Sequence, residues 1–289
     1  MRRRAGLTAL MLAVALAAGC GGGSAAPAAG ARFDSDRAFR DLRAQVALGP
    51  RPAGSPASLL LAERLRAQIP GGRFESVPGG LRNVAGALPG RGKAILVGAH
   101  YDTKDIPGFV GANDGASGTA TVLELARSLR AGRRACEREI RFVFFDGEES
   151  PSGSDDFLRD GVRGSRAYAG EHARELAAVV VVDFVGDKRL SIPREGSSNP
   201  ALWRLLREGA RRAGTIRAFP DRVGQTILDD HTPFQEAGVR AIDLIDFTYP
   251  HFHRTSDTLD KVSAASLDAA GEALVEMLQQ LARQTCHSG

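Results

Sequence analysis

The order of apolar and polar residues along the chain predicts alternating helices and strands. Apolar residues recur at helical spacing over residues 36–46 and 57–69, and a loop rich in Gly and Pro separates these two helices. Short apolar runs then alternate with further helical stretches. We predict strands at 83–87, 94–99, 140–145, 177–184, 189–192 and 241–245, and helices at 116–130, 165–176, 200–213 and 264–283.

The strand pattern also predicts how these elements are layered. Residues 178–182 would be apolar on both faces of a strand, which is typical of a sheet buried between two layers of helices. The sequence therefore predicts a three-layer α/β/α sandwich. In such sheets ligands collect at the carboxyl ends of the strands, so polar residues directly after apolar runs are the candidates for chemistry.

The first residues predict export. Three arginines at residues 2–4 precede an apolar run at 7–18, which is too short to cross a membrane comfortably. We predict a signal peptide over residues 1–19. The residues before Cys20 resemble a bacterial lipobox, so Cys20 would carry a lipid; cleavage of an ordinary signal peptide is the alternative. Residues 20–33 would form a flexible linker, and residues 34–289 a single catalytic domain.

Composition narrows the possible partners. The chain of 289 residues is 43% hydrophobic and 25% charged, as expected of a globular protein, which we expect to be a monomer. Its net charge is +4, but the arginines are scattered among acids, which argues against nucleic-acid binding. Membrane contact would come only from a lipid on Cys20. Export allows a disulfide between Cys136 and Cys286, although their spacing does not demand it.

Four of the apolar runs end in acidic residues or histidine. These residues are His100 and Asp102; Asp146, Glu148 and Glu149; Asp183; and Asp246. Carboxylates gathered at one edge of a buried sheet repel one another unless a cation lies among them. We therefore predict a metal site at this edge.

Spacing indicates how some of these residues would act. His100 and Asp102 point to the same side of an extended chain, so Asp102 can receive the second ring N–H of a metal-ligating His100; a surface pair is the alternative. Asp114 lies in a loop of small residues that opens a helix, either as a ligand or as a plain N-cap. Of the adjacent Glu148 and Glu149, one could bind metal while the other moves protons, unless both are exposed loop residues.

A late histidine would complete the site. His231, His251, His253 and His287 are the candidates, and the aromatic segment 247–252 directly before His253 favours that residue.

Taken together, these segments resemble the M28 zinc peptidase and glutaminyl cyclase superfamily over nearly all of residues 36–283. The resemblance implies a mixed, mostly parallel sheet and a zinc ion held by Asp114, Glu149 and His253, with Glu148 as acid/base. In the two-metal aminopeptidases His100 and Asp183 would complete a second site that Asp114 bridges. A cyclase would need one Zn²⁺, and an aminopeptidase two.

The residues around Asp229 favour one branch of the superfamily. Residues 229–234 read Asp-Asp-His-Thr-Pro-Phe, as in animal-type glutaminyl-peptide cyclotransferases, where aminopeptidases commonly have Ser-Asp-His. The resemblance thus implies conversion of an N-terminal Gln of peptides or proteins to pyroglutamate with release of ammonia. Asp183 and Asp229 would support proton transfer, and Tyr249 and Phe252 would line the substrate pocket.

Two alternatives remain. An M28 aminopeptidase would hydrolyse the first peptide bond of the same class of substrate. Two departures from the cyclase pattern keep this alternative open: Phe252 stands where cyclases usually have tryptophan, and Arg254 replaces their threonine. The segment 113–115 resembles the peptidases as much as the cyclases. A non-catalytic binding module is the other alternative, which the complete set of ligand residues disfavours.

Overall fold

The computed structural model describes residues 32–154 and 156–287. The expected signal peptide and the lipid-bearing Cys20 lie outside the described residues, as does the linker up to residue 31. No helix in the described part of the chain is long and apolar enough to span a membrane.

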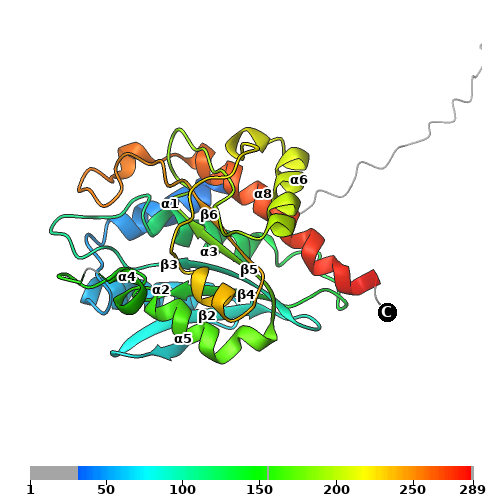
Figure 1. Ribbon diagram of the computed structural model, residues 1–289, viewed down its shortest axis with the longest axis horizontal. Helices are drawn as coiled ribbons and strands as arrows, with labels where there is room; N and C mark the ends of the chain where they lie inside the picture. The colour runs from blue at the N-terminus through cyan, green and yellow to red at the C-terminus, as the bar shows by residue number, and fades with distance from the viewer. Residues whose placement is uncertain (1–31, 155, 288–289) are drawn as a thin grey trace, which may run out of the picture. The chain divides into compact units, whose positions relative to one another are not determined.

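A six-stranded mixed sheet forms the middle layer (Figure 1). Its strands are β1 (Arg73–Val77), β2 (Leu81–Leu88), β3 (Ala94–His100), β4 (Ile140–Phe145), β5 (Leu176–Asp183) and β6 (Ala241–Ile245), in the order β1-β2-β4-β3-β5-β6. The four strands from β4 to β6 run parallel, while β2 is antiparallel to both β4 and β1. The expected α/β fold with a mostly parallel sheet is confirmed.

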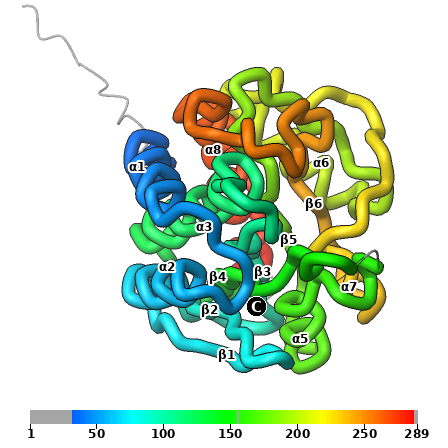
Figure 2. The backbone as a smooth tube through the Cα atoms, turned by 90° about the vertical axis from the view of Figure 1, so that its left-hand side faces the viewer, coloured from blue at the N-terminus to red at the C-terminus, as the bar shows by residue number. Residues whose placement is uncertain are grey.

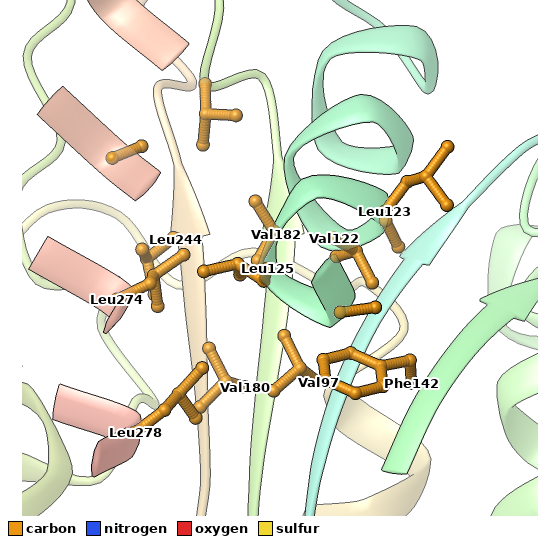
Figure 3. Packing of buried hydrophobic residues seen from close by; sticks show 14 of the residues in the cluster. Val97, Val122, Leu123, Leu125, Phe142, Val180, Val182, Leu244, Leu274 and Leu278 are labelled. Atoms are coloured by element: carbon orange, nitrogen blue, oxygen red, sulfur yellow. The ribbon is translucent and has the colours of Figure 1, made fainter. Parts of the chain in front are cut away.

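Helices cover both faces of this sheet, as Figure 2 shows. They are α1 (Ser35–Val46), α2 (Pro56–Gln68), α3 (Ala116–Ser128), α4 (Phe157–Asp160), α5 (Arg163–His172), α6 (Pro200–Ala213), α7 (Thr232–Glu236) and α8 (Ala264–Arg283). The larger core lies between the sheet and the layer of α1, α2, α3, α6 and α8, whereas α5 and α7 pack on the opposite face. In Figure 3, Val180 of β5 lies between Leu278 of α8 and Val97 of β3.

Local sequence explains where several helices begin. The side chains of Asp34, Ser55 and Ser263 each accept a backbone N–H from the third residue beyond them, which caps α1, α2 and α8. Asn199 caps α6 in the same way, and a proline follows it at the first helical position, where no N–H is needed. These boundaries match the predicted ones within one residue.

Residues 189–192 do not form the predicted strand. The carboxylate of Asp187 accepts the N–H of Arg189 at 3.1 Å, and its carbonyl accepts the N–H of Leu190 at 3.0 Å. This turn occupies backbone N–H groups that a strand would use for pairing. The short apolar run instead places Ile192 in the core.

Three of these helices and strands were not predicted from the sequence. The edge strand β1 is short and carries charged residues, and α4 and α7 have only four and five residues. The sequence did contain a signal for β1, namely the pair Gly79-Gly80, which is typical of a hairpin turn. The two glycines adopt φ values of 85° and 80° in the turn that joins β1 to β2.

A disulfide joins Cys136 to Cys286, with a Cα–Cα distance of 5.0 Å. The question that cysteine spacing left open is thus answered. The bond ties the loop before β4 to the segment after α8.

A close approach of α3 to β5 generates a test of the packing. A Cβ added to Gly118 would lie 2.0 Å from the carbonyl oxygen of Val182, whereas one added to Gly170 of α5 would meet nothing within 4 Å. We predict that Gly118→Ala lowers the free energy of unfolding by about 1–3 kcal/mol. Gly170→Ala should instead raise it by roughly 0.5–1 kcal/mol. Urea unfolding of both variants measures the difference, and equal effects would contradict this packing.

Candidate metal centre

The carboxyl ends of β3, β4 and β5 meet at one edge of the sheet. His100 is the last residue of β3 and pairs in register with Phe145, the last residue of β4. Asp183 ends the neighbouring strand β5. Glu148 and Glu149 follow β4 directly, so parallel pairing alone brings these side chains to the same edge.

Five side chains assemble there into two groups that could each hold a metal ion. The groups are His100, Asp114 and Asp183, and Asp114, Glu149 and His253. His100 Nε2 lies 3.4 Å from Asp114 Oδ1 and 3.4 Å from Asp183 Oδ1. His253 Nε2 lies 3.1 Å from Glu149 Oε1 and 3.5 Å from Asp114 Oδ2. The structure therefore brings together all five expected ligands, with Asp114 shared between the groups.

The polar atoms of this centre lack partners within the protein. Both ring nitrogens of His100 and Oδ2 of Asp114 are buried without a hydrogen bond among the described residues. Burial, together with the charge of Glu149, raises the pKa of Asp114 to about 7. Nitrogen and carboxylate donors at these distances suit a divalent transition metal, which would satisfy the unpaired atoms and offset the repulsion.

Neighbouring charges also act on the two histidines and on Glu149. Burial by itself would lower the pKa of His100, but Glu148 and Asp183 raise it well above its ordinary value. Burial would raise the pKa of Glu149, but its hydrogen bond with His253 lowers it overall. The surroundings therefore favour the protonated form of His100 and the ionised form of Glu149.

Glu148 lies beside the two groups and belongs to neither. Its Oε2 is 3.9 Å from His100 Nδ1. Burial raises its pKa well above the ordinary value, and the charges of Glu149 and Asp229 add to this effect although His100 opposes it. A carboxyl group in this position can hold and release a proton next to a bound metal.

Asp102 supports the metal centre through hydrogen bonds to the backbone of both glutamates. Its two oxygens accept the backbone N–H groups of Glu148 and Glu149, each at 3.2 Å. Its Oδ1 lies 3.6 Å from His100 Nδ1, slightly longer than a hydrogen bond. Asp102 therefore fixes the turn that carries both glutamates. It faces His100, but the expected hydrogen bond between the two side chains is not formed.

Asp257 performs a similar task for Asp114, and the sequence reasoning did not single it out. Its carboxylate accepts the N–H of Asn113 at 2.9 Å and that of Asp114 at 3.0 Å. The hydroxyl of Tyr249 donates to it at 2.6 Å. The available signal was its place four residues after the candidate ligand His253.

Lys104 was also missed. Its ammonium lies 3.2 Å from Oε2 of Glu149, while Oε1 of the same carboxylate faces His253. Lys104 thus holds one oxygen of Glu149 outside the metal centre and leaves the other to face it.

A cavity of about 370 Å³ opens next to the metal centre. Asp114, Glu148, Glu149, Asp183, Asp229 and His253 form its polar end, and its apolar walls are Phe157, Phe184, Ile227, Leu228, Ile245, Phe247 and Phe252. Its volume is in the range of small-molecule sites.

The aromatic residues of the cavity differ in part from those expected. Phe252 lines it and stacks on the ring of His253, with centroids 3.8 Å apart. Tyr249 was expected beside it, but it is buried against Phe184 and points its hydroxyl at Asp257. Tyr249 therefore supports the site instead of lining it, and Phe184 takes the place in the wall.

Other candidates lie outside the metal centre. His231 is buried between Glu195 and Asp243, at 3.4 and 3.6 Å, and His251 bonds to Ser256. Asp146 accepts the N–H of Arg82, and Asp246 that of Ser191, so both serve the fold.

Two of the three non-glycine residues with positive φ in the described part of the chain line the cavity; the third is Val162. Phe184 and His253 adopt φ values of 47° and 50°, a region that bulky residues rarely occupy. Such strained residues persist where the surrounding structure imposes them, which is common at functional sites.

Comparison with known proteins gives a consistent family. The family model described as peptidase family M28 matches residues 83–278. The chain is 30% identical to aminopeptidase YwaD of Bacillus subtilis, over 62% of this chain and 39% of that protein. It is 29% identical to a glutaminyl-peptide cyclotransferase-like protein of Bos taurus, over 72% of this chain and 65% of that protein. The chain thus spans less than two thirds of both relatives.

Solved structures with the same fold include both a cyclase and an aminopeptidase. A glutaminyl cyclase from an Acidobacteriales bacterium superposes with a TM-score of 0.76 at 31% identity, covering 90% of this chain and 99% of the other. A leucine aminopeptidase precursor from Bacteroides thetaiotaomicron also gives 0.76, at 26% identity, covering 86% and 97%. The superfamily that the sequence motifs suggested is confirmed, and both of its activities are represented among the relatives.

The support of Asp114 by Asp257 can be tested through metal retention. We predict that Asp257→Asn weakens Zn²⁺ binding about 10–100-fold, because the amide cannot accept both N–H groups and the Tyr249 hydroxyl. Competition with a chromogenic chelator measures the affinity. Asp260→Asn, an exposed change three residues further on, should leave it unaltered. Equal affinities in the two variants would contradict this role.

Proposed function

The chain belongs to peptidase family M28, and from this premise we propose that it is a zinc-dependent glutaminyl-peptide cyclotransferase. It would convert the N-terminal Gln of peptides or proteins to pyroglutamate and release ammonia. The observation that carries the proposal is Asp229, a buried carboxylate that lines the same cavity as Glu148 and Asp183. Its pKa is raised to about 6 by burial and by the charge of Asp183, so it can share protons near neutral pH.

Zinc would be held by Asp114, Glu149 and His253, whose donor atoms lie within 4.8 Å of one another. When bound there, zinc supplies a Lewis acid that polarises the γ-amide carbonyl of the substrate. His100 and Asp183 complete the other group, so the donor set alone accommodates one ion or two.

The proposed roles of the chain's own residues follow from their positions. Glu148 takes a proton from the α-amine as its nitrogen attacks the γ-carbonyl carbon, and passes that proton to the leaving nitrogen. The C–N bond of the amide then breaks and ammonia departs. Asp183 and Asp229 hold the protons of the attacking and leaving nitrogens near Glu148, and Phe184 and Phe252 exclude water that would hydrolyse the amide.

An M28 aminopeptidase is the second candidate, favoured by one specific observation. The group of His100, Asp114 and Asp183 is complete and buried, as a second metal site requires. In that reaction Glu148 would activate a water molecule for attack on the first peptide bond.

We further propose that the protein acts outside the cytoplasm as a monomer, attached to the membrane through Cys20. The disulfide between Cys136 and Cys286 supports an oxidising compartment.

Two peptides separate the candidate activities. Zinc-loaded protein should convert a Gln-initiated peptide to its pyroglutamyl form with one equivalent of ammonia, because the α-amine is held next to the amide carbon. It should release no free leucine from a Leu-initiated peptide. Mass spectrometry and an ammonia assay measure both products. Release of free leucine without formation of pyroglutamate would contradict the cyclase proposal and support the aminopeptidase.

The acid/base role of Glu148 gives a second test. We predict that Glu148→Gln lowers kcat about 10²- to 10⁴-fold while the bound zinc remains, since the residue moves protons without belonging to either ligand group. Glu171→Gln, an exposed change on α5, should retain full activity. Kinetics and metal analysis are run on the same samples, and an active, zinc-loaded Glu148→Gln protein would remove this assignment.

A further inference from the structure

Exposed apolar side chains gather around the cavity beside the metal centre. Six large hydrophobic residues are exposed in the described part of the chain: Leu60, Leu158, Val223, Leu228, Phe247 and Phe252. All except Leu60 line either this main cavity or one of two cavities that share wall residues with it. Apolar surface concentrated in this way marks a place where another molecule binds.

One adjoining cavity shares the most wall with the main cavity. This side cavity has a volume of about 230 Å³ and shares Gln225, Ile227, Ile245 and Phe247 with it. Phe247 contacts Phe252 with ring centroids 5.0 Å apart, and Phe252 stacks on His253. A continuous aromatic wall therefore leads from the metal centre to the side cavity.

The side cavity is preformed. Its outer wall, residues 222–225, is bonded to residues 194–196 by three backbone hydrogen bonds of 2.7 to 3.0 Å. A Cβ on Gly224 would lie 2.9 Å from Pro193 Cγ, so the two segments are in close contact. Because this wall is already ordered, ligand binding does not incur the entropic cost of ordering it.

The two charged residues of the side cavity, Glu195 and Arg222, differ in how they are paired. Both oxygens of Glu195 are occupied by hydrogen bonds, among them those from Ser197, Ser198 and the backbone of Ile227. The guanidinium of Arg222 has no partner among the described residues that line the cavity. The cavity thus combines the apolar Pro193, Val223 and Phe247 with the exposed guanidinium of Arg222, unpaired among the described residues, and with the buried carboxylate of Glu195, whose oxygens are already hydrogen-bonded.

We propose that the side cavity binds the side chain of the substrate's second residue and selects an apolar residue over a basic one. The inference rests on the proposed function only in placing the N-terminal residue in the main cavity. The second residue follows it by one peptide unit, which matches two cavities that share a wall. Apolar side chains fit the lining, and Arg222 repels lysine and arginine.

The test measures binding, so that it does not depend on which reaction follows. Labelled peptides beginning Gln-Leu, Gln-Ala and Gln-Lys are titrated into the zinc-loaded Glu148→Gln protein, which should bind without turnover. We expect Kd to be lowest for Gln-Leu and at least about 10-fold higher for Gln-Lys. Equal Kd values for the three peptides would overturn the inference.

Two variants in this background locate the selectivity. Val223→Asp should abolish the preference for Gln-Leu, and Arg222→Glu should shift the Gln-Lys to Gln-Leu ratio about 10-fold in favour of lysine. Leu60→Asp, the matched change at the remote exposed hydrophobic residue, should leave the ratios unaltered. The inference fails if the ratios stay constant in both Val223→Asp and Arg222→Glu. It also fails if Val223→Asp dissolves a dimer on size exclusion without altering peptide preference, since a second copy would then be the occupant.

Discussion

Mutual repulsion of buried carboxylates governs the architecture of this site. Parallel strands place Glu148, Glu149 and Asp183 at one edge of the sheet, and the loop before α3 adds Asp114. Each of these groups is almost completely removed from water, where an uncompensated charge is costly. The same positions offer a divalent cation a set of oxygen and nitrogen donors, and a bound cation would offset this repulsion. Metal binding would then be coupled to folding at this edge.

Supporting residues turn that set of donors into a defined geometry. Asp102 holds the backbone of both glutamates, Asp257 holds that of Asp114, and Lys104 fixes one oxygen of Glu149. Such contacts orient ligands and tune the metal. The strained backbone of His253 brings the last ligand to the centre from a loop, so strand register alone does not complete the site.

The sequence predicted the parts of this protein whose signals are local. Strand β6 and helices α6 and α8 were predicted with their observed bounds. Three of the five candidate ligands, His100, Glu149 and Asp183, were found as polar residues at the ends of apolar runs. Its failures involve long-range or competing interactions. The turn of Asp187 replaced an expected strand, and the position of Tyr249 depends on its bond to Asp257, which no spacing rule reveals.

Anomalous diffraction at the zinc absorption edge tests the central claim most directly. For crystals of the zinc-loaded protein, the account predicts a peak within about 2.0–2.2 Å of carboxylate oxygens of Asp114 and Glu149 and of Nε2 of His253. A further peak beside His100 and Asp183 would be compatible with that claim. A map without a peak among Asp114, Glu149 and His253 would contradict it.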